Sequence, residues 1–215
     1  MSSVIVFGGH GKVALHLTRL LAARGDRVSS VFRNPDHADD VAATGAEPVV
    51  ADIETLDVDA LADLIAGHDA VVFSAGAGGG NPARTYAVDR DAAIRIDDAA
   101  GRAGTRRFVM VSYFGAGPDH GVPEENPFYP YAQAKAAADA HLRETDLDWT
   151  VLGPSGLTLD AATGLIETGP SVAKGSVSRE DVARVIAATL DDAGTIGRTI
   201  EFNNGDTPIA EALAG

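Results

Sequence analysis

Tyr131 and Lys135 stand four residues apart in the segment YPYAQAKAAAD, which begins at Tyr129. Pro127 and Pro130 predict that a helix begins here and that its first turn contains Tyr131. Residues four apart lie on one helix face, so the lysine ammonium would lie near the phenol. A nearby ammonium and the positive end of a helix both favour the phenolate over the phenol, whose ordinary pKa is ~10. The pair could therefore transfer a proton, hold a cofactor, or reflect chance.

Chance can be bounded from the composition. The chain holds four tyrosines and only three lysines among 215 residues. A Y-x-x-x-K spacing then arises in roughly 6% of shuffled chains of this composition. The spacing also falls after the fifth predicted strand, which makes a chance occurrence less frequent still. The predicted elements around it therefore decide how it is interpreted.

The overall composition narrows the class of protein. A length of 215 residues and 45% hydrophobic content suit one globular domain. The absence of cysteine excludes disulfides and thiolate metal sites, and the six histidines show no ligand spacing, so no metal site is expected. A net charge of −14 argues against nucleic acid. No apolar run approaches the ~20 residues of a membrane helix and no signal peptide is evident, so a cytoplasmic protein without membrane contact is expected.

Short β-branched runs alternate with alanine- and leucine-rich stretches of helical spacing. Continuous apolar strands that alternate with helices predict a parallel sheet covered on both faces. Right-handed crossovers then give an α/β, three-layer, doubly wound parallel sheet, the Rossmann fold. The predicted strands are VIVF (4–7), RVSSVF (27–32), EPVVA (47–51), DAVVFS (69–74), RFVMVS (107–112) and WTVLG (149–153).

The alternation of apolar strands and helices ends after residue 153. Glycine, serine and threonine become frequent, and a helix is expected after Ser178, with Asp181 in a capping-box-like position. A strand, RTIEFNN, and a short helix after Pro208 follow. We expect one domain over residues 1–215, with 154–215 forming a small lobe on the substrate side, at the carboxyl edge of the sheet.

A glycine-rich turn joins the first strand to the first helix. In GGHGKVA, Gly8 and Gly11 permit a tight turn and close approach to a pyrophosphate, while Ala14 suits close helix–strand packing. The turn therefore predicts nucleotide binding. The candidate contacts are Gly8, Gly9, His10, Gly11, Lys12 and Val13.

Arg33 follows the second strand, where NAD enzymes typically carry an Asp or Glu that binds the adenosine ribose. A guanidinium there can bind a 2′-phosphate through two hydrogen bonds. NADP(H) is therefore the expected cofactor, with NAD(H) as the alternative. Lys12 would add positive charge near the phosphates of this acidic chain.

Two further loops follow the third and fourth strands. Asp52 and Ile53 stand where the adenine ring would lie, directly after the third strand. Ser74, Ala75 and Gly76 follow the fourth strand, and their small side chains would let the backbone pass close to the ribose and pyrophosphate. Both loops are predicted to contact the cofactor.

With these motifs in this order, the chain resembles the short-chain dehydrogenase/reductase superfamily. It is most similar to the atypical branch, with its NAD(P)H-binding, NmrA-like and biliverdin/flavin-reductase-like members. The similarity covers nearly the whole chain. The segments that carry it are GGHGKVA, FRNPDHADD, VVADIE, VVFSAGAG, VDRDAAIRIDDAAGRAGTRRFVMVSYFGA, YPYAQAKAAADAHLRETDLDWTVLGPSGLT and SREDVARVIAATL.

The resemblance implies roles for particular residues. Lys135 would bond the nicotinamide ribose, Tyr131 would exchange a proton with the substrate, and Ser112 would orient the substrate oxygen. In extended members the working Ser or Thr comes a residue or two later, where this chain has Tyr113 and Phe114. The segment GPSGLT matches a loop that lies against the nicotinamide, with Gly153 in place of its usual arginine. Its expected cofactor contacts are Pro154, Ser155, Gly156 and Leu157.

Three functions remain open from the sequence. The first is an NADP(H)-dependent oxidoreductase or epimerase-like enzyme that acts on a small carbonyl or alcohol. The second is an NADPH-dependent flavin or quinone reductase, which does not strictly need Tyr131. The third is a non-catalytic, NmrA-like protein that senses NADP(H). A small-molecule substrate is the expected partner, and the chain is expected to be a monomer or a homodimer.

Overall fold

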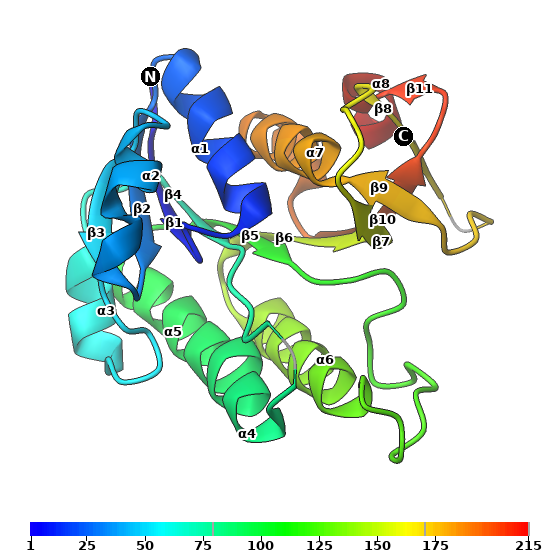
Figure 1. Cartoon of the computed structure of the whole chain (residues 1–215), viewed down its shortest axis with the longest axis horizontal. Helices are drawn as coiled ribbons and strands as arrows, with labels where there is room; N and C mark the ends of the chain where they lie inside the picture. The colour runs from blue at the N-terminus through cyan, green and yellow to red at the C-terminus, as the bar shows by residue number, and fades with distance from the viewer. Residues whose placement is uncertain (79, 170, 215) are drawn as a thin grey trace.

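The computed structural model describes residues 1–78, 80–169 and 171–214. A mostly parallel sheet forms the middle layer, and helices cover both of its faces (Figure 1). Helices α1 (Lys12–Ala23) and α7 (Arg179–Asp191) pack side by side on one face. Helices α3 (Val58–Ile65), α5 (Ala93–Ala103) and α6 (Tyr129–Glu144) cover the other face. The predicted three-layer Rossmann fold is confirmed.

The strand order in the described chain is β11-β8-β10-β6-β5-β4-β1-β2-β3. The 3-2-1-4-5-6 portion is the order of dinucleotide-binding folds, in which ligands bind where the order reverses, here beside β1 and β4. Among the described strands of this sheet, β8 runs antiparallel to both of its neighbours, β10 and β11, and the other pairings are parallel. The strands are β1 (Ser3–Phe7), β2 (Arg27–Phe32), β3 (Glu47–Val50), β4 (Ala70–Phe73), β5 (Arg107–Val111), β6 (Asp148–Pro154), β8 (Leu165–Thr168), β10 (Arg198–Asn204) and β11 (Thr207–Pro208), with β7 (Gly156–Thr158) and β9 (Ser176–Ser178) forming a separate parallel pair.

From Pro82 to α5 the chain is one helical run with a wider turn inside it. The π-helical stretch η2 (Tyr86–Ala92) joins α4 (Pro82–Thr85) to α5 and carries the buried Asp89. Such π-turns are rare and often mark functional sites. The remaining helices are η1 (Pro35–His37), α2 (Ala38–Ala42), η3 (Ala193–Thr195) and α8 (Ile209–Ala214). Among the described residues, no helix is both long and apolar enough to cross a membrane.

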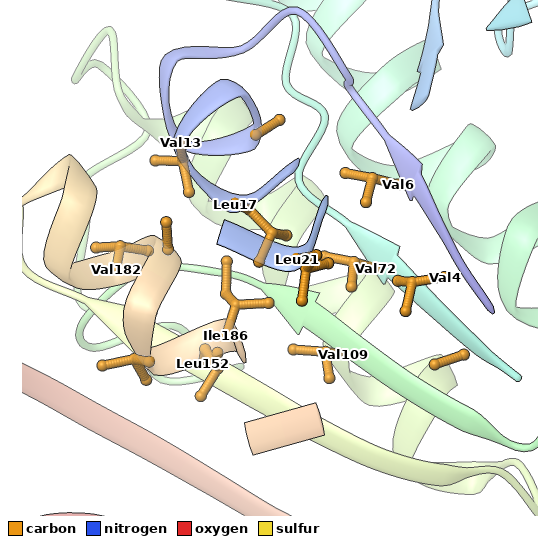
Figure 2. Close-up of a cluster of buried hydrophobic side chains, with 14 of the residues drawn as sticks. Val4, Val6, Val13, Leu17, Leu21, Val72, Val109, Leu152, Val182 and Ile186 are labelled. Carbon is orange, nitrogen blue, oxygen red and sulfur yellow. The ribbon is translucent and has the colours of Figure 1, made fainter. Parts of the chain in front are cut away.

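The apolar sides of the sheet form two cores, one under each helical layer. Figure 2 shows the first, in which Leu17 and Leu21 of α1 meet Ile186 of α7 above the sheet. β-branched side chains of the strands, such as Val6 and Val109, belong to the same core (Figure 2). The leucines recur at helical spacing and therefore face the continuous apolar strands. Burial of these side chains fixes the position of α1 and of the loop that precedes it.

The C-terminal segment, residues 154–215, adds strands to the central sheet. Strand β10 pairs in parallel with β6, and α7 closes over α1. The β7–β9 pair lies beyond β6, on the side where the glycine turn opens (Figure 1). Half of the expected box is present at Ser178, whose Oγ accepts the Asp181 amide at 2.9 Å. The Asp181 carboxylate does not bond the Ser178 amide but accepts from the Ser178 hydroxyl and from the Thr163 and Gly164 amides.

Candidate functional site

The glycine turn is held on β2 by backbone hydrogen bonds. The amides of Gly8 and Gly9 both donate to Val31 O, at 3.0 and 2.8 Å, and the Gly11 amide donates to Gly8 O at 2.8 Å. Gly11 caps α1 without any side-chain hydrogen bond to the first-turn amides. The positive end of α1 is therefore left available to an anion.

The turn also packs closely against the loop after β4. Gly8 has φ +89°, and a Cβ there would lie 2.6 Å from both Ala75 Cα and Ala75 N. A Cβ on Gly9 would lie 2.1 Å from Ser30 Oγ. Glycine is required at both positions because neighbouring chain occupies the space of a side chain.

A cavity of about 390 Å³ lies on the β2–β3 side of the turn. Its wall brings together most of the residues predicted to hold the adenosine half of a dinucleotide. They are Gly8, His10, Gly11, Arg33, Asp52, Ile53, Ser74, Ala75 and Gly76.

Arg33 reaches this cavity but already has an ionic partner. Its Nη1 donates to Glu54 Oε1 at 2.7 Å, and the same oxygen accepts from Arg84 Nε at 3.1 Å. Glu54 and Arg84 both line the cavity, and the sequence prediction missed them. A 2′-phosphate would therefore meet two guanidiniums bridged by a carboxylate rather than one free arginine.

His10 faces the same cavity from inside the turn. Its ring stacks on His37 with centroids 3.6 Å apart, and its Nε2 lies 3.0 Å from Asp40 Oδ2. Of the described residues, no group of three or more His, Asp or Glu could hold a metal ion. His10 therefore shapes the turn and the cavity wall together with His37.

A second cavity, of about 560 Å³, lies on the β5–β6 side of the turn and shares Gly11, Ser74, Ala75 and Gly76 with the first. The two form one groove that passes over the positive end of α1. The other predicted residues that line this half are Lys12, Val13, Ser112, Tyr131, Pro154, Ser155, Gly156 and Leu157. Both volumes lie within the ~300–1,000 Å³ typical of ligand sites.

Tyr131 stands at the wall of this second cavity, beside two other aromatic rings. The centroids of Phe128 and Tyr113 lie 5.1 and 5.5 Å from that of Tyr131. The Lys174 ammonium lies 5.8 Å from the Tyr113 ring centroid. Within the described chain the Tyr131 hydroxyl forms no hydrogen bond, so it is available to a bound molecule.

The environment of Tyr131 favours the protonated phenol, contrary to our expectation from sequence. Desolvation by the surrounding chain is the main cause that raises the pKa of Tyr131, and the carboxyls of Asp89 and Asp139 raise it further. Tyr131 is therefore a hydrogen-bond donor or acid at neutral pH, not a general base.

Lys135 does not reach the cavity in this structure. Its side chain is 1% exposed, and its Nζ lies 3.4 Å from Met110 Sδ and 5.3 Å from the Phe73 ring centroid. Among the described residues no carboxylate oxygen lies within ion-pair distance of it. The expected contact with a nicotinamide ribose is not present in this arrangement, because the side chain turns into the interface between α6 and the sheet.

Ser112, at the end of β5, has a partner that the sequence prediction missed. Its Oγ donates to Asp139 Oδ2 at 2.6 Å, and both residues are buried. Asp139 is on the same helix as Tyr131, one turn beyond Lys135. That i+4 spacing is the signal from which it could have been found.

Taken together, the groove fits a dinucleotide by its own chemistry. The required glycines leave room for a pyrophosphate, the end of α1 supplies positive charge, and cations stand at the adenosine end. The nicotinamide end carries a phenol and a serine hydroxyl, which can bond a substrate oxygen.

Comparison with known proteins agrees with this geometry. Residues 8–193 match the model of an NAD(P)H-binding family. The "Uncharacterized sugar epimerase YhfK" of Bacillus subtilis is 35% identical over 213 residues, which cover 98% of each chain. The solved "Putative NAD-dependent epimerase/dehydratase" of Bacillus halodurans is also 35% identical, with a TM-score of 0.90 and 99% of each chain covered. The anaerobilin reductase ChuY of Escherichia coli is 25% identical with a TM-score of 0.79, covering 95% of this chain and 98% of its own. This chain belongs to the NAD(P)H-binding family of atypical short-chain dehydrogenase/reductases.

Proposed function

We propose that this protein is an NADPH-dependent reductase of a small carbonyl compound. The observation that carries the proposal is the continuous groove, which starts at Arg33 and ends at the hydroxyls of Tyr131 and Ser112. Bound nicotinamide would supply a hydride. The chain supplies the oxygen-binding donors that a reduced carbonyl needs.

The protonation of Tyr131 is compatible with carbonyl reduction. Reduction needs donors that bind the developing alkoxide, whereas alcohol oxidation needs a base to remove a proton. The raised pKa of Tyr131 keeps its phenol protonated, so it can donate a hydrogen bond to a carbonyl oxygen but cannot act as that base. The name of the relative ChuY, a reductase, is consistent with this direction.

The preference for NADPH over NADH rests on the cations at the adenosine end. Arg33 and Arg84 converge on Glu54, and Arg33 remains half-exposed to an incoming phosphate. Glu54 bonds both guanidiniums through one oxygen, so neither arginine is fully neutralised and both can attract a 2′-phosphate.

The test is NADPH oxidation by purified protein with a panel of small aldehydes and ketones. Tyr131→Phe should lower kcat at least ~10-fold with the best carbonyl, because it removes an oxygen-binding donor. Tyr129→Phe is the matched control, since its hydroxyl bonds Gln133 and Glu124 outside the groove. Equal turnover by the Tyr131→Phe variant and the wild type would refute the role of the phenol.

Flavin or quinone reduction is the second candidate, favoured by the aromatic wall of Tyr113, Phe128 and Tyr131 beside the cavity. Such acceptors need hydride but no fixed proton donor. Turnover with a flavin or quinone that Tyr131→Phe leaves unchanged would identify this function. Protein that binds NADPH and reduces no acceptor would instead support a sensor.

A further inference from the structure

A single hydrogen bond joins the groove to a buried group of acids. Ser112 lines the cavity, and its Oγ lies 2.6 Å from Asp139 Oδ2. The Asp139 side chain is fully buried, and its other oxygen, Oδ1, has no hydrogen-bond partner. A buried carboxyl with one unpaired oxygen is costly when ionised, so this arrangement needs a physical explanation.

The surroundings of Asp139 hold more acid than base. Asp89 and Asp97 are each 1% exposed, and neither Asp97 oxygen has a hydrogen-bond partner. Desolvation raises the pKa of all three carboxyls, and the Lys135 ammonium opposes that shift in each. Lys135 is shared by all three carboxyls, while Arg84 acts on Asp89 and Arg143 acts on Asp139, so burial outweighs the cations and favours the protonated form of the group.

The charged and titratable groups that act on Asp139 come from several elements. Lys135 and Arg143 on α6 favour its ionised form, as does the Ser112 hydrogen bond. Desolvation by burial is what raises the pKa of Asp139 against these three effects. The negative charge of Asp139 in turn raises the pKa of Asp97 on α5 and of the phenols Tyr113 and Tyr131.

We propose that Asp139 is a proton reservoir that supplies the reduced substrate through the Ser112 hydroxyl. The proposal rests on the reductase function proposed above. Asp139 is a positioning residue in this scheme, because it acts through Ser112 and does not touch the substrate.

The proposed reduction accounts for each hydride, proton and bond. The carbonyl carbon gains a hydride from the nicotinamide cofactor, which leaves oxidised. When Asp139 is protonated, its carboxyl is the donor across the 2.6 Å contact and the Ser112 hydroxyl is free to donate to the substrate. The carbonyl oxygen then takes the proton of Ser112 Oγ, and Oγ takes the proton of Asp139. The carboxylate that remains accepts a hydrogen bond from Ser112 and regains its proton from water through the same hydroxyl. One carbon–oxygen π bond breaks, one C–H and one O–H bond form, and Asp139 is left as a carboxylate near Lys135.

Tyr131 has no comparable acid behind it. Its hydroxyl lines the cavity and has no hydrogen-bond partner in the described chain. Tyr131 therefore orients the acceptor oxygen, while Ser112 alone is backed by a buried acid.

The decisive experiment measures kcat against pH for Asp139→Asn, Ser112→Ala and the double variant. Asp139→Asn should lower kcat at least ~10-fold with the Kd for NADPH unchanged, since the cofactor groove is intact. Wild-type kcat should fall as the pH rises through the pKa of Asp139, and this fall should be absent from Asp139→Asn. The double variant should be no slower than Ser112→Ala, because both residues serve one path.

Asp98→Asn is the matched control, because Asp98 is an exposed α5 residue that pairs with His141 at the surface. Its kcat and pH profile should match the wild type. Asp139→Asn turnover within twofold of wild type, retention of the alkaline fall, or multiplicative losses in the double variant would overturn the relay.

A second measurement does not depend on turnover. The carboxyl ¹³C resonance of Asp139 should titrate above the ordinary range of aspartate, and Ser112→Ala should shift that titration upward by removing a hydrogen bond to the carboxylate. An Asp139 that ionises near pH 4 overturns the reservoir even if the reductase function stands. Wild-type protein that reduces no acceptor overturns the reductase function and the catalytic relay, and the titration then shows whether Asp139 stores a proton at all.

Discussion

Substitution of Gly8 by alanine tests whether close packing of the glycine turn creates the groove. Gly8 has φ +89°, which costs a residue with a side chain about 1–2 kcal/mol. The new Cβ would also lie 2.6 Å from the Ala75 backbone, and forced displacement of packed chain costs about 1–3 kcal/mol more. We therefore expect Gly8→Ala to lower the free energy of unfolding by about 2–5 kcal/mol.

Gly67→Ala separates the two contributions. Gly67 has φ +78°, but nothing lies within 4 Å of a Cβ placed there. The Gly67→Ala variant should therefore lose only the conformational part of the free energy of unfolding, about 1–2 kcal/mol. The difference between the two variants measures the close approach of Gly8 to Ala75.

Urea denaturation followed by the fluorescence of Trp149, the only tryptophan, gives both free energies, provided that the two m-values agree. Ala75 lines both halves of the groove, so its displacement should also weaken NADPH binding at least ~10-fold, which is ~1.4 kcal/mol. Gly67→Ala should bind NADPH as the wild type does. Equal destabilisation of the two variants, or wild-type NADPH affinity in Gly8→Ala, would refute this account of the turn.

Three further outcomes follow from the charges of the site. Glu54→Gln should raise the affinity for NADPH relative to NADH about 2–5-fold in paired titrations, because the carboxylate no longer neutralises Arg33 and Arg84; an unchanged ratio would count against a phosphate site there. Asp97→Asn should flatten the pH dependence of stability. The folded Asp97 binds its proton more tightly than the unfolded chain does, so wild-type stability falls as pH rises from about 4 toward its raised pKa. Chemical denaturation at pH 5 and pH 8 checks this. An equal change in the free energy of unfolding between the two pH values in both proteins would contradict it. Lys135→Gln should leave the Kd for NADPH within about threefold of wild type, because the ammonium is buried away from the groove. It should also lower the free energy of unfolding, because the buried carboxyls lose their shared cation. A tenfold loss of affinity would show that Lys135 does contact the ribose.

The sequence located most of the groove because its signals are local. The glycine turn must follow a strand and precede a helix, and the predicted strands 4–7 and 27–32 agree closely with β1 and β2. Residues at the carboxyl ends of parallel strands gather at one edge of the sheet, so Arg33, Asp52 and Ser74 meet there. The helix that carries Tyr131 was also predicted, from its prolines and its alanine-rich run.

The prediction failed where the outcome depends on which way a side chain turns. Spacing placed Lys135 beside Tyr131, but packing of α6 on the sheet turned the ammonium toward Met110 and Phe73. The ammonium and the helix end were expected to shift Tyr131 toward the phenolate, but desolvation and the buried carboxyls raise its pKa instead. Glu54 gave no local signal, because its bonds to Arg33 and Arg84 join the loops after β2 and β3 to helix α4.

By itself, then, the sequence determined the order of strands and helices, the glycine turn and the face on which α6 carries its polar residues. These follow from hydrophobic periodicity and backbone restrictions, which act over a few residues. The tertiary structure alone decided the protonation of Tyr131, the withdrawal of Lys135 and the hydrogen bond between Ser112 and Asp139. Each of these depends on desolvation and on contacts between residues far apart in the chain, which exist only once β5, η2, α5 and α6 have packed together.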